Sequence, residues 1–269
     1  MSEPEPKFEA LKVERSGELL EVTLNRPKSL NALNQQMVTE LRELFQRLYF
    51  NREIRVVLLR ASGPTFCAGL DLKEQADIDP EEMSASMGLD RQRSIAEIYV
   101  AMRRCPQPII SVVQGAASGG GFALALASDI RLLTPDARMN AAFIRIGLTA
   151  CDMGVSYFLP RIVGWSRANE YLLTGRFIGA QSALEMGLAN RVAPYEDALQ
   201  EARLFVEDML RATPLGLRLT KDGINQSIDA SGLEAVMAIE DRNQVLAALD
   251  PNFREGVNAF LEKRPPRFT

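Results

Sequence analysis

Residues 114–125, QGAASGGGFALA, contain the strongest structural signal in this sequence. It follows an apolar run at residues 109–113 that predicts a strand, and it leads into small apolar residues at 122–127 that predict a buried helix. Three consecutive glycines at the turn let the backbone approach a ligand closely. The positive end of the following helix lies at the same point, so this turn can hold negative charge.

A second glycine-marked segment, GPTFCAGLDLK at residues 63–73, follows another apolar run at residues 55–60. The glycine triplet does not begin a dinucleotide-binding loop, because Leu124 stands where that fingerprint needs glycine, and no Gly-Lys-Ser/Thr follows it. On its own the triplet could be a flexible turn before a buried helix. The second segment favours a shared site instead.

Composition limits the functions that this chain can perform. Its 269 residues are 46% hydrophobic, enough for one large core or for one core with a small appendage. The net charge of −4 leaves no broad basic face for nucleic acid. No apolar run approaches the ~20 residues that cross a bilayer. The acidic, proline-rich start is unlike a targeting peptide, so we expect a disordered tail at residues 1–7 and a cytoplasmic protein.

The chain contains no histidine. Its absence excludes Ser-His-Asp hydrolysis, zinc sites of the His-Glu-x-x-His type and acid–base catalysis by imidazole. The three cysteines are scattered, which argues against a disulfide framework, and we expect no metal site. Any proton transfer must therefore use Asp, Glu, Lys, Tyr, Cys or water.

Strand and helix patterns alternate up to about residue 195, which predicts an α/β architecture. On the residues alone, a doubly wound sheet fits as well as any other arrangement. Beyond that point strand patterns stop, and we expect a core at residues 8–195 and a helical region at 196–269. Strands are predicted at residues 18–24, 56–59, 108–113, 130–133 and 138–140, and helices at 34–49 (with Asn34 as N-cap), 89–103, 122–127, 197–212, 214–226, 231–247 and 252–263.

Taken together, the two glycine-marked segments resemble the signature of the crotonase superfamily, the enoyl-CoA hydratases and isomerases. The resemblance covers most of the chain and includes TLNRPKSLNAL at residues 23–33 and AFLEKR at residues 259–264. It implies a core of ββα units wound as a spiral, followed by a C-terminal α-helical region that trimerises. The implied assembly is a homotrimer or a hexamer.

The resemblance also implies roles for individual residues. The backbone N–H groups of Leu70 and Gly120 would both donate to the oxygen of an acyl-CoA thioester and stabilise an enolate. Coenzyme A would enter only as part of this substrate, and no separate cofactor is expected. The residues that would contact it are Arg26, Lys28, Ala32, Ala68, Asp71, Leu72, Lys73, Phe260 and Lys263, of which the last two often meet the coenzyme of a neighbouring subunit.

The sequence departs from the hydratase pattern at both acid/base positions, which hold Ala123 and Phe143. Apolar side chains cannot activate water or carry a proton, so the resemblance does not imply ordinary hydration. Asp152 falls where dienoyl-CoA isomerases and chlorobenzoyl-CoA dehalogenases place an aspartate near the substrate. The dehalogenase role is weakened because that enzyme also uses a histidine. The alternative role for Asp152 is an N-cap of the helix predicted after it.

We therefore expect an acyl-CoA-processing enzyme of the enoyl-CoA hydratase/isomerase family. Isomerisation is favoured over hydration, because a single carboxylate, Asp152, can move a proton. Two alternatives stay open: a hydratase or other lyase with atypical acid/base groups, and a non-catalytic acyl-CoA-binding protein whose apolar pocket holds the acyl chain without reacting.

Overall fold

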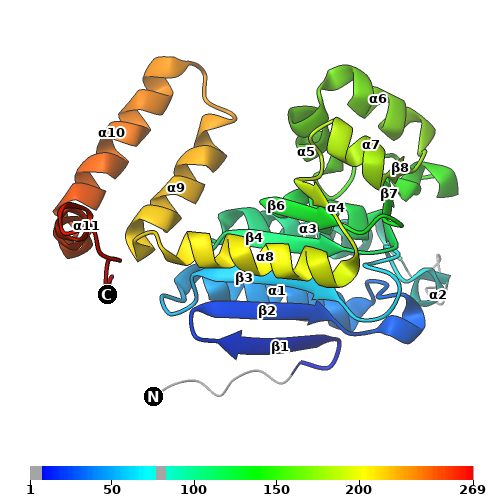
Figure 1. Ribbon diagram of the computed structural model, residues 1–269. Coiled ribbons are helices and arrows are strands. Elements are labelled where there is room, and N and C mark those ends of the chain that lie inside the picture. The colour runs from blue at the N-terminus through cyan, green and yellow to red at the C-terminus, as the bar shows by residue number, and fades with distance from the viewer. Residues whose placement is uncertain (1–7, 77–82, 269) are drawn as a thin grey trace.

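The computed structural model describes residues 8–76 and 83–268, and its centre is a six-stranded sheet (Figure 1). β1 and β2 are antiparallel, and every other neighbouring pair is parallel. Parallel neighbours need long crossovers, which the intervening helices supply. The strands, in their order across the sheet, are β1 (Leu11–Ser16), β2 (Leu19–Leu24), β3 (Val56–Ala61), β4 (Ile109–Val113), β6 (Ile130–Leu133) and β9 (Arg191–Val192).

A second, three-stranded sheet joins β5 (Ala116–Ser118), β7 (Arg138–Asn140) and β8 (Ile178–Gly179). The chain leaves the first sheet at β4, forms β5 in the second, and returns to the first through helix α4 (Gly120–Ala127) and β6. A single doubly wound sheet, which the residues alone allowed, is therefore not what forms. Two strands and a helix make one turn of a spiral, as the crotonase resemblance implied.

Alternate residues of β3 face opposite sides of the first sheet, as the period of a strand requires. Val57 and Leu59 belong to the large core beneath helices α1 (Gln35–Phe50) and α3 (Ala85–Arg104). Val56 and Leu58 pack with Ala198, Ala202 and Val206 of α8 (Tyr195–Leu210), which crosses the other face. Burying each such aliphatic side chain contributes about 1.5–3 kcal/mol. Helix α8, which begins the predicted region 196–269, is thus part of the sheet's packing.

Strand β1 has no counterpart among the predicted strands. Most of its residues are exposed and its sequence, LKVERS, is rich in charge, so a buried pattern is absent. The strand is held by pairing with β2 and by a side chain from another element: the buried carboxylate of Glu40 in α1 accepts hydrogen bonds from the N–H groups of Glu9, Ala10 and Leu11. In contrast, the predicted N-cap of α1 is confirmed, because the Asn34 side chain accepts from the N–H of Met37 at 3.0 Å.

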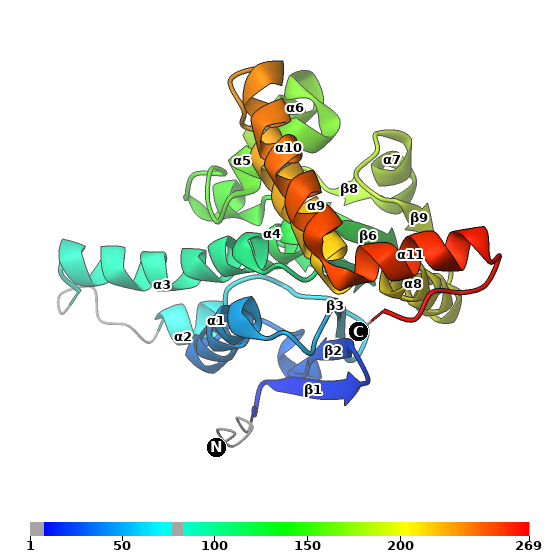
Figure 2. The ribbon, with the colours of Figure 1, turned by 90° about the vertical axis from the view of Figure 1, so that its left-hand side faces the viewer.

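The last three helices form an arm beside the core, at the end of the molecule opposite α2 (Leu72–Ala76) (Figures 1 and 2). They are α9 (Pro214–Ser227), α10 (Leu233–Leu249) and α11 (Pro251–Leu261). Large apolar side chains on this arm are exposed in the single chain, among them Leu233, Val245, Leu249 and Phe260. None of the helices in the described part of the chain is long and apolar enough to cross a membrane.

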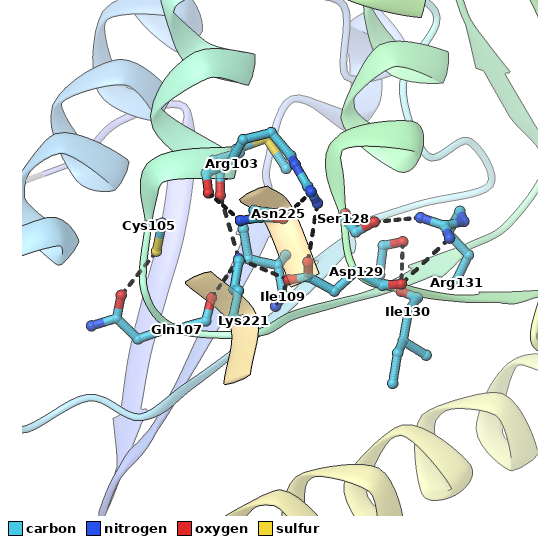
Figure 3. A network of polar contacts seen from close by, with 12 residues as sticks. Arg103, Cys105, Gln107, Ile109, Ser128, Asp129, Ile130, Arg131, Lys221 and Asn225 are labelled. Atoms are coloured by element: carbon cyan, nitrogen blue, oxygen red, sulfur yellow. Dashed lines mark hydrogen bonds and ion pairs between the residues drawn. The ribbon is translucent and has the colours of Figure 1, made fainter. Parts of the chain in front are cut away.

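A polar network fixes the base of this arm to the core (Figure 3). Lys221 of α9 is only 5% exposed, and its Nζ lies 2.8 Å from an Asp129 carboxylate oxygen and 2.8 Å from the Gln107 carbonyl oxygen. Arg103 at the end of α3 pairs with the same aspartate at 3.2 Å and also hydrogen-bonds Asn225 of α9. One buried cation thus joins α9 to the segments that follow α3 and α4.

The remaining elements are short helices. Met153 and Gly154 lead into α5, and Gly164 separates α5 from α6. These elements are the 3₁₀ helices η1 (Pro27–Ser29) and η2 (Ala142–Ile146) and the α-helices α5 (Val155–Val163), α6 (Trp165–Thr174) and α7 (Ala180–Glu185).

Candidate active site

Backbone contacts bring the two glycine-marked segments together. Cys67 and Ala117 form a parallel bridge, in which the Cys67 N–H donates to Ala116 O at 3.1 Å and the Ser118 N–H donates to Cys67 O at 3.0 Å. These contacts set the segment after β3 alongside β5, immediately before the glycine triplet. The predicted union of residues 63–73 with residues 114–125 is therefore confirmed.

Gly69 and Gly120 lie side by side at the end of this pairing. A Cβ atom added to Gly69 would stand 2.8 Å from the Ser118 carbonyl oxygen and 3.6 Å from the Gly120 nitrogen. Gly69 also has a φ of +98°, a conformation that side chains other than glycine rarely adopt. The close approach and the backbone conformation both explain why glycine occupies this position.

The N–H groups of Leu70 and Gly120 have no acceptor among the described residues. The flanking groups are used: Leu33 donates to the Gly69 carbonyl at 2.7 Å, and Asp71 donates to the Leu33 carbonyl at 3.1 Å. Gly120 is the first residue of α4, so its N–H belongs to the positive end of that helix. Two donors from distant segments, both unpaired among the described residues, thus lie near each other and can donate hydrogen bonds to one anionic oxygen.

Tight packing surrounds Gly120. A Cβ atom there would meet Leu33 Cδ1 at 2.6 Å, the Tyr99 hydroxyl at 3.0 Å and Met153 Sδ at 3.2 Å. The Tyr99 hydroxyl donates a hydrogen bond to the Gly120 carbonyl oxygen at 3.1 Å. Burial raises the pKa of Tyr99 well above its usual range, so this hydroxyl stays protonated and neutral.

Apolar side chains occupy both positions where the hydratase pattern has an acid. Ala123 is fully buried in α4, and Phe143 in η2 is 4% exposed. The Phe143 ring packs over the glycine triplet, 3.2 Å from where a Cβ atom of Gly119 would be. Neither residue can supply a proton or orient water.

Asp152 lies just before Met153, in the segment that leads into α5. One of its carboxylate oxygens, Oδ1, accepts a hydrogen bond from Gln92 Nε2 at 2.5 Å and another from the Met153 N–H at 2.7 Å. Burial raises the pKa of Asp152, and these two hydrogen bonds oppose that rise. The alternative role as N-cap is wrong, because Gly154 caps α5 and no side chain bonds to the first turn of that helix.

The segments predicted to meet coenzyme A adjoin one another. Arg26 pairs with Asp71 at 3.0 Å and donates to the Ala32 carbonyl oxygen, and the Ala68 N–H donates to the Leu30 carbonyl at 3.0 Å. Arg26 thus holds the two segments together by an ion pair, in addition to any ligand contact. The other predicted contacts in this region, Lys28, Leu72 and Lys73, are exposed.

Phe260 and Lys263 are not brought to this site within one chain. Phe260 lies on α11 and Lys263 two residues beyond that helix, whereas α2, which follows Leu70, is at the other end of the molecule (Figure 1). Phe260 is 83% exposed. Their predicted contact with coenzyme A would need a neighbouring subunit, as the resemblance implied.

Three residues around the site escaped the sequence analysis: Gln92, Tyr99 and Met153. The sequence analysis places Tyr99 only within the helix predicted at residues 89–103. One sequence signal could have found Gln92. It lies seven residues, about two helical turns, before Tyr99, and therefore on the helix face that also carries the buried Ile95. A polar side chain on a buried helix face needs a partner, and Asp152 provides it.

The thiol of Cys67 is buried, and a groove beside Tyr99 does not include the predicted oxyanion donors. Burial raises the pKa of Cys67 to about 12, so the thiol stays protonated. A groove of about 1450 Å³ lies between α1, α3, α5 and α9, and Tyr99 and Met153 line it, whereas Leu70 and Gly120 do not. Across the described residues, no group of three or more cysteines and carboxylates could hold a metal ion.

Comparisons with known proteins agree with this geometry. Residues 14–269 match the family model described as enoyl-CoA hydratase/isomerase. A "probable enoyl-CoA hydratase" of Mycobacterium bovis is 36% identical over 94% of this chain and 90% of its own length. The 1,2-epoxyphenylacetyl-CoA isomerase of Escherichia coli is 34% identical over 93% of this chain and 95% of its own length. The crystal structure of an enoyl-CoA hydratase of Mycobacterium smegmatis superimposes with a TM-score of 0.89, at 33% identity, over 97% of this chain and 99% of that one.

Proposed function

Because the chain belongs to the enoyl-CoA hydratase/isomerase family, we propose that it is an isomerase that shifts a double bond within an unsaturated acyl-CoA thioester. One arrangement carries the proposal. The Asp152 carboxylate stands next to the Met153–Tyr99–Gly120 contacts, while Ala123 and Phe143 leave the two usual acid positions apolar. One carboxylate suffices to move a proton between two carbons, whereas hydration needs a group that activates water.

In the proposed reaction the thioester oxygen accepts hydrogen bonds from the Leu70 and Gly120 N–H groups. Asp152 removes a proton from the α-carbon of a 3-enoyl thioester, and the electron pair of that C–H bond delocalises onto the thioester oxygen as a dienolate. The protonated carboxyl group then gives the proton to the γ-carbon, which yields the 2-enoyl thioester. No atom is gained or lost, and each N–H donor would stabilise the charged intermediate by about 2.7–4 kcal/mol.

The environment of Asp152 supports this role. Burial raises the pKa of its carboxyl group, which makes the carboxylate a better proton acceptor than an exposed aspartate. Substrate binding would bury it further. The proposed step requires no cofactor other than the coenzyme A that the substrate carries.

A hydratase with atypical acid/base groups is the second candidate, because several relatives are named enoyl-CoA hydratases. In that case a group other than residues 123 and 143 would have to activate the water. Incubation of a 2-enoyl-CoA in ¹⁸O-labelled water separates the two reactions, since only hydration places the label on the β-carbon.

The decisive experiment follows 3-enoyl-CoA substrates of several chain lengths with the wild-type enzyme, Asp152→Asn and the control Asp90→Asn. Asp90 is a matched carboxylate on α3 whose side chain is 73% exposed. We expect isomerisation by the wild type and by the control, and a loss of about 10²- to 10⁴-fold in kcat for Asp152→Asn. Unchanged turnover in Asp152→Asn, or a wild-type product that carries oxygen from water, would overturn the proposal.

The coenzyme and the assembly belong to the same proposal. Exposed Lys28 and Lys73 would meet the coenzyme A phosphates, and Arg26, Ala32, Ala68, Asp71 and Leu72 would shape the groove for its adenine and pantetheine. The exposed apolar residues of α10 and α11 support a homotrimer or hexamer, in which Phe260 and Lys263 reach a neighbour's coenzyme. Lys263→Ala should weaken binding of a CoA ester while light scattering shows an unchanged oligomer.

A further inference from the structure

The two oxygens of the Asp152 carboxylate have different surroundings. Oδ1 accepts from Gln92 Nε2 at 2.5 Å and from the Met153 N–H at 2.7 Å. No residue in the described part of the chain donates to Oδ2. The carboxylate is therefore held by one oxygen, while the lone pairs of the other are available.

The residue that holds Oδ1 belongs to the helix that also supports Gly120. Gln92 and Tyr99 lie seven residues apart on α3, about two helical turns, so both project from the same face. Tyr99 hydrogen-bonds the Gly120 carbonyl, and Gln92 hydrogen-bonds Asp152. One face of α3, with Tyr99 buried and Gln92 half-buried, thus contacts both the turn that carries one predicted oxyanion donor and the predicted base.

We propose that Gln92 is a positioning residue: its amide holds Oδ1 so that Oδ2 of Asp152 takes the proton and returns it. This inference rests on the proposed function and adds to it a residue that acts through Asp152. A carboxylate held only by the adjacent backbone N–H could turn about its Cβ–Cγ bond and exchange its two oxygens. A second donor, from another element, opposes that rotation and keeps one oxygen in place for proton transfer.

The same hydrogen bond has an electrostatic consequence. A donor to the charged form lowers the pKa of the Asp152 carboxyl group and opposes the rise caused by burial. Among the described residues, Tyr99 of α3 is the titratable side chain that interacts with Asp152. Burial raises the pKa of Tyr99, so it stays neutral and adds no charge beside the carboxylate. Removing Gln92 should therefore reduce the ionised fraction of Asp152 at a given pH.

Two substitutions test the role. Gln92→Met keeps the length of the side chain and removes the donor, and Gln92→Glu places a second carboxylate beside the first. For Gln92→Met we expect kcat to fall about 10- to 100-fold, with KM unchanged. The acid limb of the kcat–pH profile should move to higher pH, and it should move further for Gln92→Glu. The control Arg93→Met, at an exposed position of the same helix, should keep the wild-type profile.

A second readout does not depend on turnover. In protein with ¹³C-labelled aspartate carboxyl groups, the Asp152 resonance, assigned from its absence in Asp152→Asn, should titrate at higher pH in Gln92→Met than in the wild type. A wild-type titration and pH profile in Gln92→Met, even with a lower melting temperature, would overturn the inference and leave the proposed function standing. Wild-type turnover in Asp152→Asn would overturn the proposed function, and the inference with it.

Discussion

The Tyr99 hydroxyl lies 3.1 Å from the Gly120 carbonyl oxygen and 3.2 Å from the sulfur of Met153. This contact ties α3 to the first turn of α4, where the N–H of the same glycine is unpaired among the described residues. Because Tyr99 is 2% exposed, its hydroxyl has no solvent to replace the contact. Tyr99 therefore holds the first turn of α4 in place, and the position of one predicted oxyanion donor depends on a side chain from another helix.

Tyr99→Phe should lower kcat several-fold, because the Gly120 peptide loses its hydrogen bond while the ring still fills the core. The Gly120 carbonyl keeps its acceptor role within α4. Losing the tyrosine's hydrogen bond should therefore lower the free energy of unfolding by only about 0.5–1.5 kcal/mol. The alkaline side of the pH profile should not change, since the pKa of Tyr99 is raised well above its usual range. Steady-state kinetics and urea unfolding check this. The control Tyr49→Phe, at a ring that is 48% exposed, should have neither effect, and equal behaviour of the two variants would contradict the prediction.

Gly69→Ala should lower kcat by more than about 10²-fold, which is the loss typical for one missing oxyanion donor. The added methyl group would stand 2.8 Å from the Ser118 carbonyl oxygen and would push the Leu70 peptide away from Gly120. Gly17→Ala is the matched control: it also has a positive φ, +61°, but nothing lies within 4 Å of the added atom. Kinetics and thermal unfolding of the two variants separate loss of the site from backbone strain alone. A fully active Gly69→Ala enzyme would refute this role for the glycine.

Asp152→Asn should make the protein more stable at neutral pH. Burial raises the pKa of Asp152 above the 3.8 usual for an aspartate. When the pKa of a carboxyl group is higher in the folded state than in the unfolded state, the group stabilises the fold at pH values below its unfolded-state pKa. This stabilisation is lost as the pH rises through the folded-state pKa. At neutral pH the ionised, partly buried carboxylate therefore lowers the free energy of unfolding, and replacing it by a neutral asparagine should remove this destabilisation. Urea unfolding should show the gain at neutral pH and no gain below the usual aspartate pKa. A less stable variant at neutral pH would contradict this.

Restoring carboxylates at the two apolar positions should add hydration. The double variant Ala123→Glu and Phe143→Glu supplies the acid and base that the hydratase pattern places there. Both sites are buried, so we expect a loss of stability together with a small but measurable yield of 3-hydroxyacyl-CoA from a 2-enoyl-CoA. Each single variant is the control and should form none. Hydration by the wild type at the rate of the double variant would show that these positions do not choose the reaction.

Lys221→Met should loosen the C-terminal arm. The substitution leaves Asp129 paired with Arg103 alone, so the loss should stay below the ~3–5 kcal/mol typical of a broken buried pair. Hydrogen exchange should increase along α9. Lys12→Met is the control, because Lys12 pairs with Glu14 at an exposed site and should cost under about 1 kcal/mol. Identical unfolding curves for the two variants would rule out an anchoring role for Lys221.

Features that depend on near neighbours in the chain could be predicted from the residues alone. Turn glycines, the cap at Asn34, the strand at residues 138–140 and the helix that starts at Pro214 followed from local patterns. The residues also show which chemistry is impossible, since a chain without histidine and with Ala123 and Phe143 lacks those groups in any fold. The resemblance added the family and the spiral core.

Which distant groups meet could not be predicted without the three-dimensional structure. The division of the strands into two sheets, the meeting of Gly69 with Gly120, and the holding of Asp152 by Gln92 all join residues far apart in sequence. From the sequence, Asp152 is equally suited to cap a helix, because a local pattern does not show which group its side chain will contact. Such contacts depend on how whole helices and strands pack together. The free energy of that packing is distributed over many core residues, so no single residue or local pattern reveals it.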